Sequence, residues 1–302
     1  MMRSLLKSLD RWWFGSDAPH AIALFRIVIG SLALLNLLMI GLDFQDWFSE
    51  IGFVPSALGY EYLQSHSRFT LLPFGNSTIT AIFYVAVILA AVGTVLGYKT
   101  RVCAIALAVG YISLHHRNAL ILHSGDTMLR LCLVYLACSP AGAAYSLDAL
   151  QRAKKGLEPI LSAPVWAQRL VSFQVAVVYF TTVWHKMYGT YWLDGTASYY
   201  PTQLHEFDRF WVPQFMDTGP FFVKLTTYGT LLVELALATL VFWKPARKWV
   251  VLAGIAMHGY IEYRFNIPLF AFIMMASYIC FYSGTEVQAF ISKLVRRKEL
   301  AT

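Results

Sequence analysis

The chain reads YFTTVWHKMYGTYWLDG over residues 179–195, where a long apolar run ends in a histidine, a lysine and a turn. Lys186 lies at the end of the apolar run, and an ionisable side chain there needs a physical reason. One reason is snorkelling, in which the aliphatic stem lies along apolar surface while the ammonium group reaches the lipid headgroups. The other is chemical, because burial disfavours the charged form of a lysine and so prepares it to act as a general base.

The composition indicates a membrane protein. Of the 302 residues, 58% are hydrophobic and 14% are charged, and the mean hydropathy is +0.55. A soluble domain would carry roughly 25% charged residues. The formal net charge of +7 comes from short groups of lysine and arginine between apolar runs, a pattern typical of cytoplasmic loops and not of a nucleic-acid-binding face.

The apolar runs predict an all-α, polytopic membrane helix bundle. A helix needs about 20 mostly apolar residues to cross the hydrocarbon core, and eight runs approach this length. Lysine and arginine gather between alternate runs, whereas the two long outside loops carry only Arg68 and Arg209. This asymmetry predicts cytoplasmic N- and C-termini and places Lys186 near the extracytoplasmic face. The runs cover approximately residues 20–42, 78–98, 102–122, 126–146, 165–186, 220–243, 247–262 and 267–284.

We expect a single transmembrane domain over residues 1–302, without a soluble lumenal domain. Residues 1–18 lack the long apolar stretch of a cleaved signal peptide and predict an amphipathic interfacial helix. Residues 285–302 are expected to form a basic cytoplasmic tail. The predicted location is the cell membrane, as a multi-pass protein of a bacterial inner membrane whose active face is extracytoplasmic.

Neither the cysteines nor the histidines predict a metal site. The four cysteines fall inside apolar runs without a Cys-x-x-Cys pair, and we expect buried free thiols. His115 and His116 are neighbours, but adjacent helical residues point about 100° apart and cannot easily share one ion. The cysteines are Cys103, Cys132, Cys138 and Cys280.

Ionisable side chains inside apolar runs are costly, so each is a candidate for function, with structural pairing as the alternative. A structural interpretation pairs Arg26 or Arg130 with Glu234, which lies near the middle of the sixth run. We expect structural or coupling roles for five such residues. They are Arg26, Arg117, Asp126, Arg130 and Glu234.

A second polar group surrounds His258. His258 and Glu262 lie four positions apart and share one helix face, and Arg264 and Asn266 follow at the turn into the last run. A lone histidine on an apolar face is commonly a hydrogen-bonded core residue. The predicted topology, however, places this group at the same outer face as Lys186.

Several short motifs of this chain match segments of a known family, in the same order along the sequence. Tyr-Phe-x-x-x-x-x-Lys followed by Trp-x-x-Gly resembles the segment that holds the catalytic lysine of the vitamin K-dependent gamma-glutamyl carboxylases. Lys186 falls on that lysine, with one extra residue before Trp192. The chain as a whole resembles the horizontally transferred transmembrane (HTTM) domain family, which contains the membrane part of these carboxylases. The other matching segments are residues 23–30, 97–101, 117–118, 125–126, 192–197 and 258–277.

The resemblance implies a chemistry. In the carboxylases the lysine deprotonates a reduced quinone, whose reaction with oxygen makes a base that removes the gamma proton of a peptide glutamate, and the carbanion takes up carbon dioxide. By resemblance, this chain would be a quinol-dependent enzyme of the epoxidase or carboxylase (carbon–carbon lyase) type, with menaquinol or vitamin K hydroquinone as cofactor and no metal. Lys186 would be the base and His258 would orient the quinone. The candidate cofactor-binding residues are Trp184, Trp192, Tyr260, Arg264 and Asn266.

Two departures from the carboxylases bear on the substrate. The chain ends about 18 residues past the eighth run, without the lumenal domain that binds a propeptide, and Gly125 replaces a histidine that helps carboxylation. The expected partners are membrane lipids and a peptide or secreted-protein substrate, with no nucleic acid. The alternative is a non-catalytic membrane protein that binds a lipid, a quinone or a partner and assists maturation or export of another protein.

Overall fold

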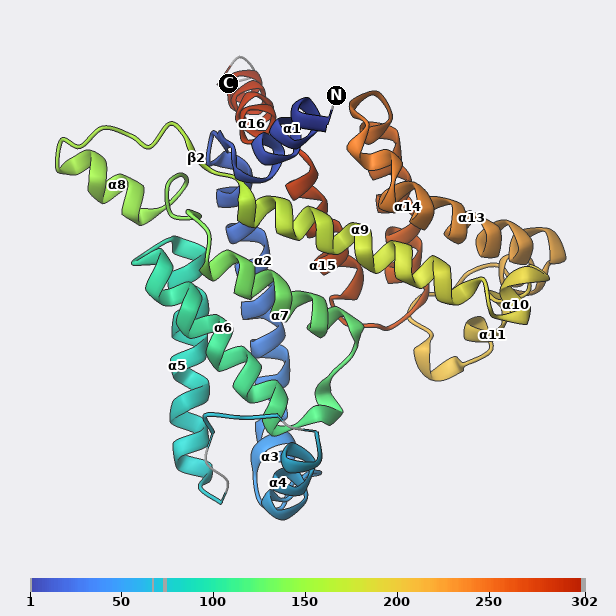
Figure 1. Cartoon of the computed structure of the whole chain (residues 1–302). Coiled ribbons are helices and arrows are strands. Elements are labelled where there is room, and N and C mark those ends of the chain that lie inside the picture. Colours follow the sequence, from blue (N-terminus) through green and yellow to red (C-terminus); the bar gives the residue numbers. More distant parts are fainter. Residues whose placement is uncertain (1, 67, 73–74, 300–302) are drawn as a thin grey trace. The chain divides into compact units, whose positions relative to one another are not determined.

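A computed structural model describes residues 2–66, 68–72 and 75–299 and confirms the all-α class (Figure 1). In this part of the chain, 16 α-helices and four 3₁₀ turns accompany two short strands. The strands β1 (Ser16–Asp17) and β2 (Ala163–Pro164) form one antiparallel pair. The chain divides into two compact units, residues 1–169 with 282–302 and residues 170–281. We call them the first and the second unit.

The first unit is built on four packed helices. α2 (His20–Leu42) packs against α5 (Ser77–Leu96) and α7 (Ser124–Ala137), and α6 (Thr100–Arg117) packs against α5 and α7 (Figure 1). Their contacts bury small and branched apolar side chains such as those of Ala33 and Leu107. The other helices are α1 (Met2–Phe14), α3 (Phe44–Phe48), α4 (Ser56–Ser65), η1 (Ala119–Ile121), α8 (Leu147–Lys154) and α16 (Gly284–Glu299), which packs on α2.

The turn between α5 and α6 requires glycine. Gly97 has a φ of 68°, a left-handed conformation that is strained for residues with a side chain. A Cβ at this position would also collide with the side chains of Ser146 and Arg26. This tight turn therefore brings α5 and α6 side by side.

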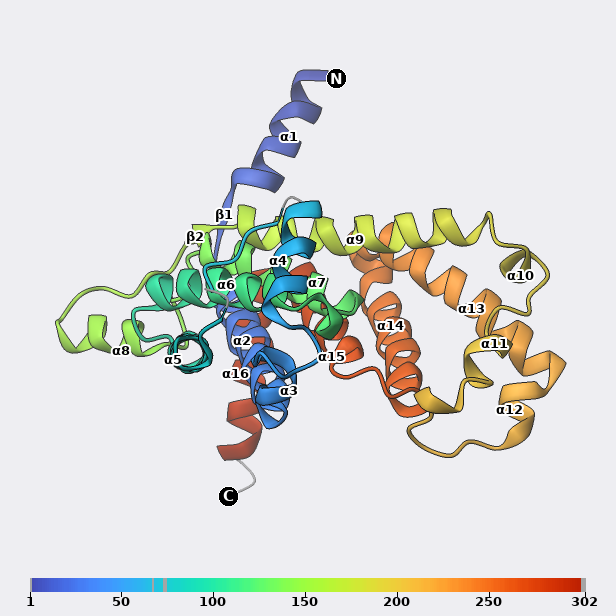
Figure 2. The same cartoon turned by 90° about the horizontal axis from the view of Figure 1, so that it is seen from below.

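The second unit contains most of α9 (Trp166–Lys186) together with α13 (Pro220–Ala238), α14 (Lys244–Arg264) and α15 (Phe270–Ser277). α14 packs against α13 and α15. α13 begins at a proline, whose fixed φ suits the first turn of a helix. Short helices gather beside α13 (Figure 2). They are α10 (Thr190–Leu193), α11 (Tyr199–Thr202), η2 (His205–Phe207) and α12 (Gln214–Thr218), and η3 (Leu240–Phe242) and η4 (Tyr278–Phe281) complete the unit.

Among the described residues, three helices are long and apolar enough to cross a membrane, namely α2, α5 and α13. A fourth span results if Phe270–Phe281 and Gly284–Arg296 are counted as one broken span. Helices lie in all eight predicted runs, but α7 has only 14 residues and α6 ends in His-His-Arg. The several apolar helices support a membrane protein, whereas the count of eight and the orientation stay predictions.

Two sequence expectations are modified by the structure. All four cysteines are free, but the expectation that all are buried is wrong, because Cys138 lies exposed where α7 ends and Cys103 is half-buried. Within the expected interfacial segment, α1 covers Met2–Phe14, and Ser16–Asp17 form β1. Residue 1 of that segment and residues 300–302 of the expected tail lie outside the described residues.

Candidate functional site

Lys186 forms an ion pair with Glu234. The Lys186 Nζ lies 2.6 and 2.7 Å from the two carboxylate oxygens of Glu234, which projects from α13. The same Nζ lies 4.6 Å from the centroid of the Trp192 ring, within cation–π range. The side chains are largely buried, with 21% of Lys186 and 10% of Glu234 exposed. The predicted pairing of Glu234 with Arg26 or Arg130 is therefore wrong.

His258 belongs to a buried chain of hydrogen bonds. Its Nε2 lies 2.7 Å from the Tyr179 hydroxyl, which in turn lies 2.5 Å from the Tyr278 hydroxyl. All three side chains are buried, and the Nδ1 of His258 has no hydrogen-bond partner within the described residues. The ring of Phe270 packs 5.6 Å from the imidazole. A neutral imidazole has one donor and one acceptor nitrogen, so His258 keeps one unused polar atom.

One face of α9 presents both groups. Tyr179, Thr182 and Lys186 lie three and four positions apart and therefore on the same side of the helix. Thr182 connects them, because its hydroxyl lies 2.9 Å from the Tyr179 carbonyl oxygen and 3.4 Å from the Glu234 carboxylate. At 1.5 Å per residue, Lys186 and Tyr179, which is the partner of His258, are separated by roughly 10 Å along α9. The structure therefore brings the two predicted catalytic residues to one helix face, each with its own partners.

Two predicted cofactor-binding aromatics lie on other helix faces. Trp184 is two positions before Lys186, roughly 200° around the helix, and packs on Tyr188 with ring centroids 5.7 Å apart. Tyr260 is likewise two positions after His258 and is half-buried. Their role as walls of a quinone pocket stays a prediction, whereas Trp192 directly contacts Lys186.

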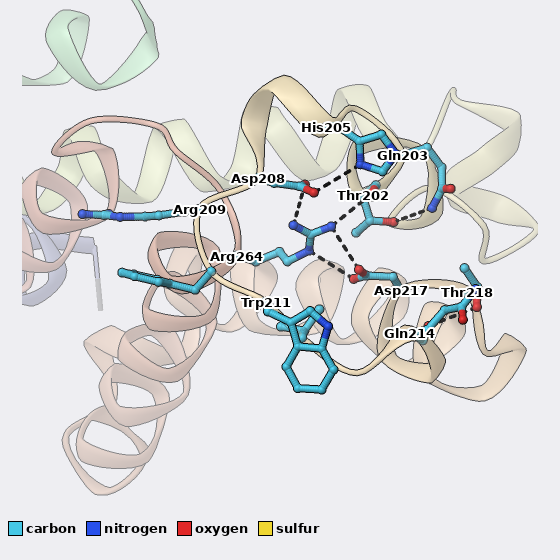
Figure 3. Close-up of a pocket in the computed structure, with 12 residues that line it drawn as sticks. Thr202, Gln203, His205, Asp208, Arg209, Trp211, Gln214, Asp217, Thr218 and Arg264 are labelled. Atoms are coloured by element: carbon cyan, nitrogen blue, oxygen red, sulfur yellow. Dashed lines mark hydrogen bonds and ion pairs between the residues drawn. The ribbon is translucent and has the colours of Figure 1, made fainter.

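Arg264 clamps the segment between α9 and α13 to the end of α14. Figure 3 shows its guanidinium between two carboxylates, with Nε and Nη2 3.2 and 3.0 Å from Asp217 and Nη1 2.5 Å from Asp208. Nη2 also donates to the Thr202 carbonyl oxygen at 3.1 Å. Hydrogen bonds from His205 and from Arg264 lower the pKa of the Asp208 carboxyl. The cavity around this cluster measures about 420 Å³.

Backbone contacts extend this clamp. Asn266 donates its backbone N–H to the Phe207 carbonyl oxygen at 2.6 Å, while its side chain is exposed. Arg209 donates its backbone N–H to Arg264 and its guanidinium to the Glu262 carboxylate. Every nitrogen of the Arg264 guanidinium is bonded within this cluster, and four of its five N–H groups are in use. The predicted roles of Arg264 and Asn266 in ligand binding stay untested beside this structural one.

The ionisable residues of the first unit have partners within that unit. Arg26 donates to the carbonyl oxygens of Ala141 and Tyr145 at 2.9 and 2.5 Å, fixing the turn before α8. Asp126 caps α7 by accepting the backbone N–H of His123 at 3.0 Å. Arg117 lies 3.8 Å from Glu50, and Arg130 donates to the Thr127 hydroxyl at 3.2 Å. In the part of the chain that the structure describes, no group of three histidine, cysteine or acidic side chains could hold a metal.

Sequence reasoning missed Tyr179, Tyr278, Asp208 and Asp217. A signal existed for Tyr179, because it begins the Tyr-Phe-x-x-x-x-x-Lys motif and seven positions are two helical turns. For the three others, the partners Tyr179 and Arg264 lie far away in the sequence, so no local pattern marks those contacts.

The fold and the site define an all-α membrane protein with a buried lysine–glutamate pair. Residues 14–285 match the HTTM domain, and the chain belongs to the HTTM domain family, as the sequence motifs predict. It is similar to the uncharacterized protein YitO of Bacillus subtilis, with 32% identity over 111 residues. The match covers 35% of this chain and 35% of YitO, so the chain spans about a third of that relative's length. No solved structure matches.

Proposed function

We propose that this HTTM-domain protein is a membrane enzyme of the gamma-carboxylase-like type, which uses a reduced quinone to act on a peptide or small substrate at the outer leaflet. One observation carries the proposal. Lys186, which falls on the carboxylase lysine, shares one face of α9 with Tyr179, and Tyr179 bonds to His258, which falls on the carboxylase histidine. Lys186 in turn pairs with Glu234 of α13. The bonds to Glu234 and to His258 join segments that lie far apart in the sequence.

Glu234 gives Lys186 a route to its basic form. Moving one proton from the ammonium to the carboxylate yields an amine and a carboxylic acid, and the pair is neutral overall before and after the transfer. In surroundings of low polarity such a transfer avoids the cost of an uncompensated charge. The resulting amine is a general base that can accept a hydroxyl proton. A bound reduced quinone would supply that hydroxyl and the electrons that reduce oxygen.

His258 fits the orienting role because of its unused Nδ1. A buried polar atom without a partner is costly, and a ring oxygen of the quinone would satisfy it. The Tyr179 hydroxyl, bonded to Nε2, fixes the rotation of the imidazole. Trp192 covers the ammonium of Lys186 and limits the access of water.

The membrane orientation forms part of the proposal. Eight spans with both termini in the cytoplasm of a bacterium would bring the end of α9 to the extracytoplasmic face of the inner membrane. The support is the lysine and arginine asymmetry, together with a helix in each of the eight runs.

The test uses purified protein in lipid nanodiscs, incubated with vitamin K hydroquinone or menaquinol under oxygen, with quinone epoxide followed by mass spectrometry. We expect epoxide from the wild type and from Lys224→Ala, a control at an exposed lysine of α13. Lys186→Ala should lower the rate at least about 100-fold, the usual contribution of a general base. Equal epoxide from Lys186→Ala would refute the base assignment, and none from folded wild type would refute the enzyme.

The non-catalytic alternative is favoured by the same ion pair, because a lysine matched with a carboxylate is also a common structural element. In that case the protein binds a lipid, a quinone or a partner and assists maturation or export of another protein. It predicts that Lys186→Met combined with Glu234→Leu preserves function, since an apolar pair of similar volume can replace a buried ion pair.

A further inference from the structure

Basic side chains gather in the first unit where α6 ends and α7 begins. A cavity of about 250 Å³ is lined there by His116 and Arg130. Arg68 directly precedes Phe69, whose carbonyl oxygen bonds to the imidazole of His116. The helical spacing explains the lining. Thr127, Arg130, Leu131 and Val134 share one face of α7, and Ile112 and His116 lie four positions apart on α6.

These basic side chains lack acidic partners. Arg130 donates to the Thr127 hydroxyl, Arg68 lies over the Tyr62 ring at 5.4 Å, and the Nδ1 of His116 lies 2.7 Å from the Phe69 carbonyl oxygen. Among the residues that the structure describes, neither arginine forms an ion pair.

The nearby negative charge is already engaged. The Asp126 carboxylate accepts from the His123 backbone and from the Asn36 amide. The Nη1 atom of Arg68 is buried without a hydrogen-bond partner. An anion would stabilise the Arg130 guanidinium that lines the cavity and would satisfy the unused donor of Arg68.

We propose that this cavity binds the phosphate of an anionic lipid headgroup. Guanidinium groups match phosphate oxygens with paired, charge-assisted hydrogen bonds, and basic pockets between membrane helices recognise lipid headgroups. The remaining walls, Ile112, Leu131 and Val134, are apolar and suit the first carbons of the acyl chains. The volume lies below the roughly 300–1,000 Å³ of pockets that enclose a whole small molecule, so the chains would remain in the bilayer.

This site is independent of the quinone chemistry, because it uses none of the residues bonded to Lys186 or His258. The phosphate group that binds here could belong to a lipid headgroup or be free inorganic phosphate. The apolar walls favour the lipid.

The test measures lipid binding to the full chain by native mass spectrometry from detergent micelles. Dioleoyl phosphatidic acid is compared with dioleoyl phosphatidylcholine, with and without inorganic phosphate as competitor. The variants are Arg130→Gln and Arg68→Gln, and the matched control is Arg101→Gln, the same change at an exposed position at the start of α6. Size-exclusion chromatography and circular dichroism establish that each variant is folded.

We expect the wild type and Arg101→Gln to prefer phosphatidic acid, and each of the other variants to bind it about tenfold more weakly, as for the loss of one charged hydrogen-bond partner. Arg130→Lys keeps the positive charge but loses the paired donors of the planar guanidinium, and it should give an intermediate affinity. Absence of any preference in the wild type would overturn the proposal even if the glutamine variants do not fold. An equal loss in Arg101→Gln would also overturn it, and displacement of the lipid by inorganic phosphate would overturn the lipid as the source.

Discussion

Replacing Glu234 by leucine removes the carboxylate that lies 2.6 Å from the Lys186 Nζ. Breaking a buried pair by removing one partner costs about 3–5 kcal/mol, because the other charge remains uncompensated. The Lys186 side chain is 21% exposed and retains the Trp192 ring, so water and the indole recover part of that cost. We therefore expect Glu234→Leu to lower the free energy of unfolding by about 2–3 kcal/mol.

The double variant Lys186→Met with Glu234→Leu isolates the interaction. With both charges removed, its free energy of unfolding should lie within about 1 kcal/mol of the wild type. The assay is SDS titration in mixed lipid–detergent micelles, followed by tryptophan fluorescence. Lys224→Met, at an exposed lysine on α13, is the control and should change stability by less than about 0.5 kcal/mol.

Glu234→Leu, Lys186→Met and the double variant together form a double-mutant cycle. If the destabilisation of the double variant equals the sum of the two single ones, the side chains are not coupled. The inference that Glu234 compensates the charge of Lys186 would then be wrong, and the proton route between them would lose its basis.

Three further predictions concern other parts of the second unit. Tyr179→Phe should cost about 2 kcal/mol, because it leaves the buried imidazole and the Tyr278 hydroxyl without their common partner, whereas Tyr278→Phe should cost about 1 kcal/mol; the same titration measures both. Arg264→Gln should speed hydrogen exchange across residues 199–219 relative to the rest of the unit, and unchanged exchange would contradict the clamp. Because hydrogen bonds from the neighbouring histidine and from Arg264 lower the folded-state pKa of Asp208, its contribution to stability is present above the unfolded pKa of about 3.9 and is lost as the pH falls through the folded pKa. The difference between the melting temperatures at pH 6 and at pH 3 should therefore be smaller for Asp208→Asn than for the wild type.

The sequence predicted the helices better than their contacts. The run over 220–243 is apolar and begins with a proline, and the structure has a helix from Pro220 to Ala238. The partner of Glu234, which lies on this helix, was mispredicted. Position within an apolar run and charge were the only criteria, and by these Arg26 and Arg130 were equally suitable. Lys186 lies 48 positions from Glu234, and only the fold of the second unit brings the two side chains together.

Arg26 shows why the other half of that prediction failed. Its guanidinium donates to the backbone carbonyl oxygens of Ala141 and Tyr145. Every residue carries a carbonyl oxygen, so no residue type marks it as an acceptor, and a search for acidic partners misses it. At a turn, carbonyl oxygens that accept no hydrogen bond within a helix are available to a buried arginine.

Lys186→Arg separates the enzymatic from the structural interpretation. An arginine can keep the ion pair with Glu234, since its planar fork matches a carboxylate, but it does not deprotonate in proteins and cannot serve as a base. If Lys186 is the base, this variant keeps the stability of the wild type to within about 1 kcal/mol and loses epoxide formation as fully as Lys186→Ala. Retained stability with retained activity would show that the charge matters and the proton does not, and the pair would then be a structural element of the fold.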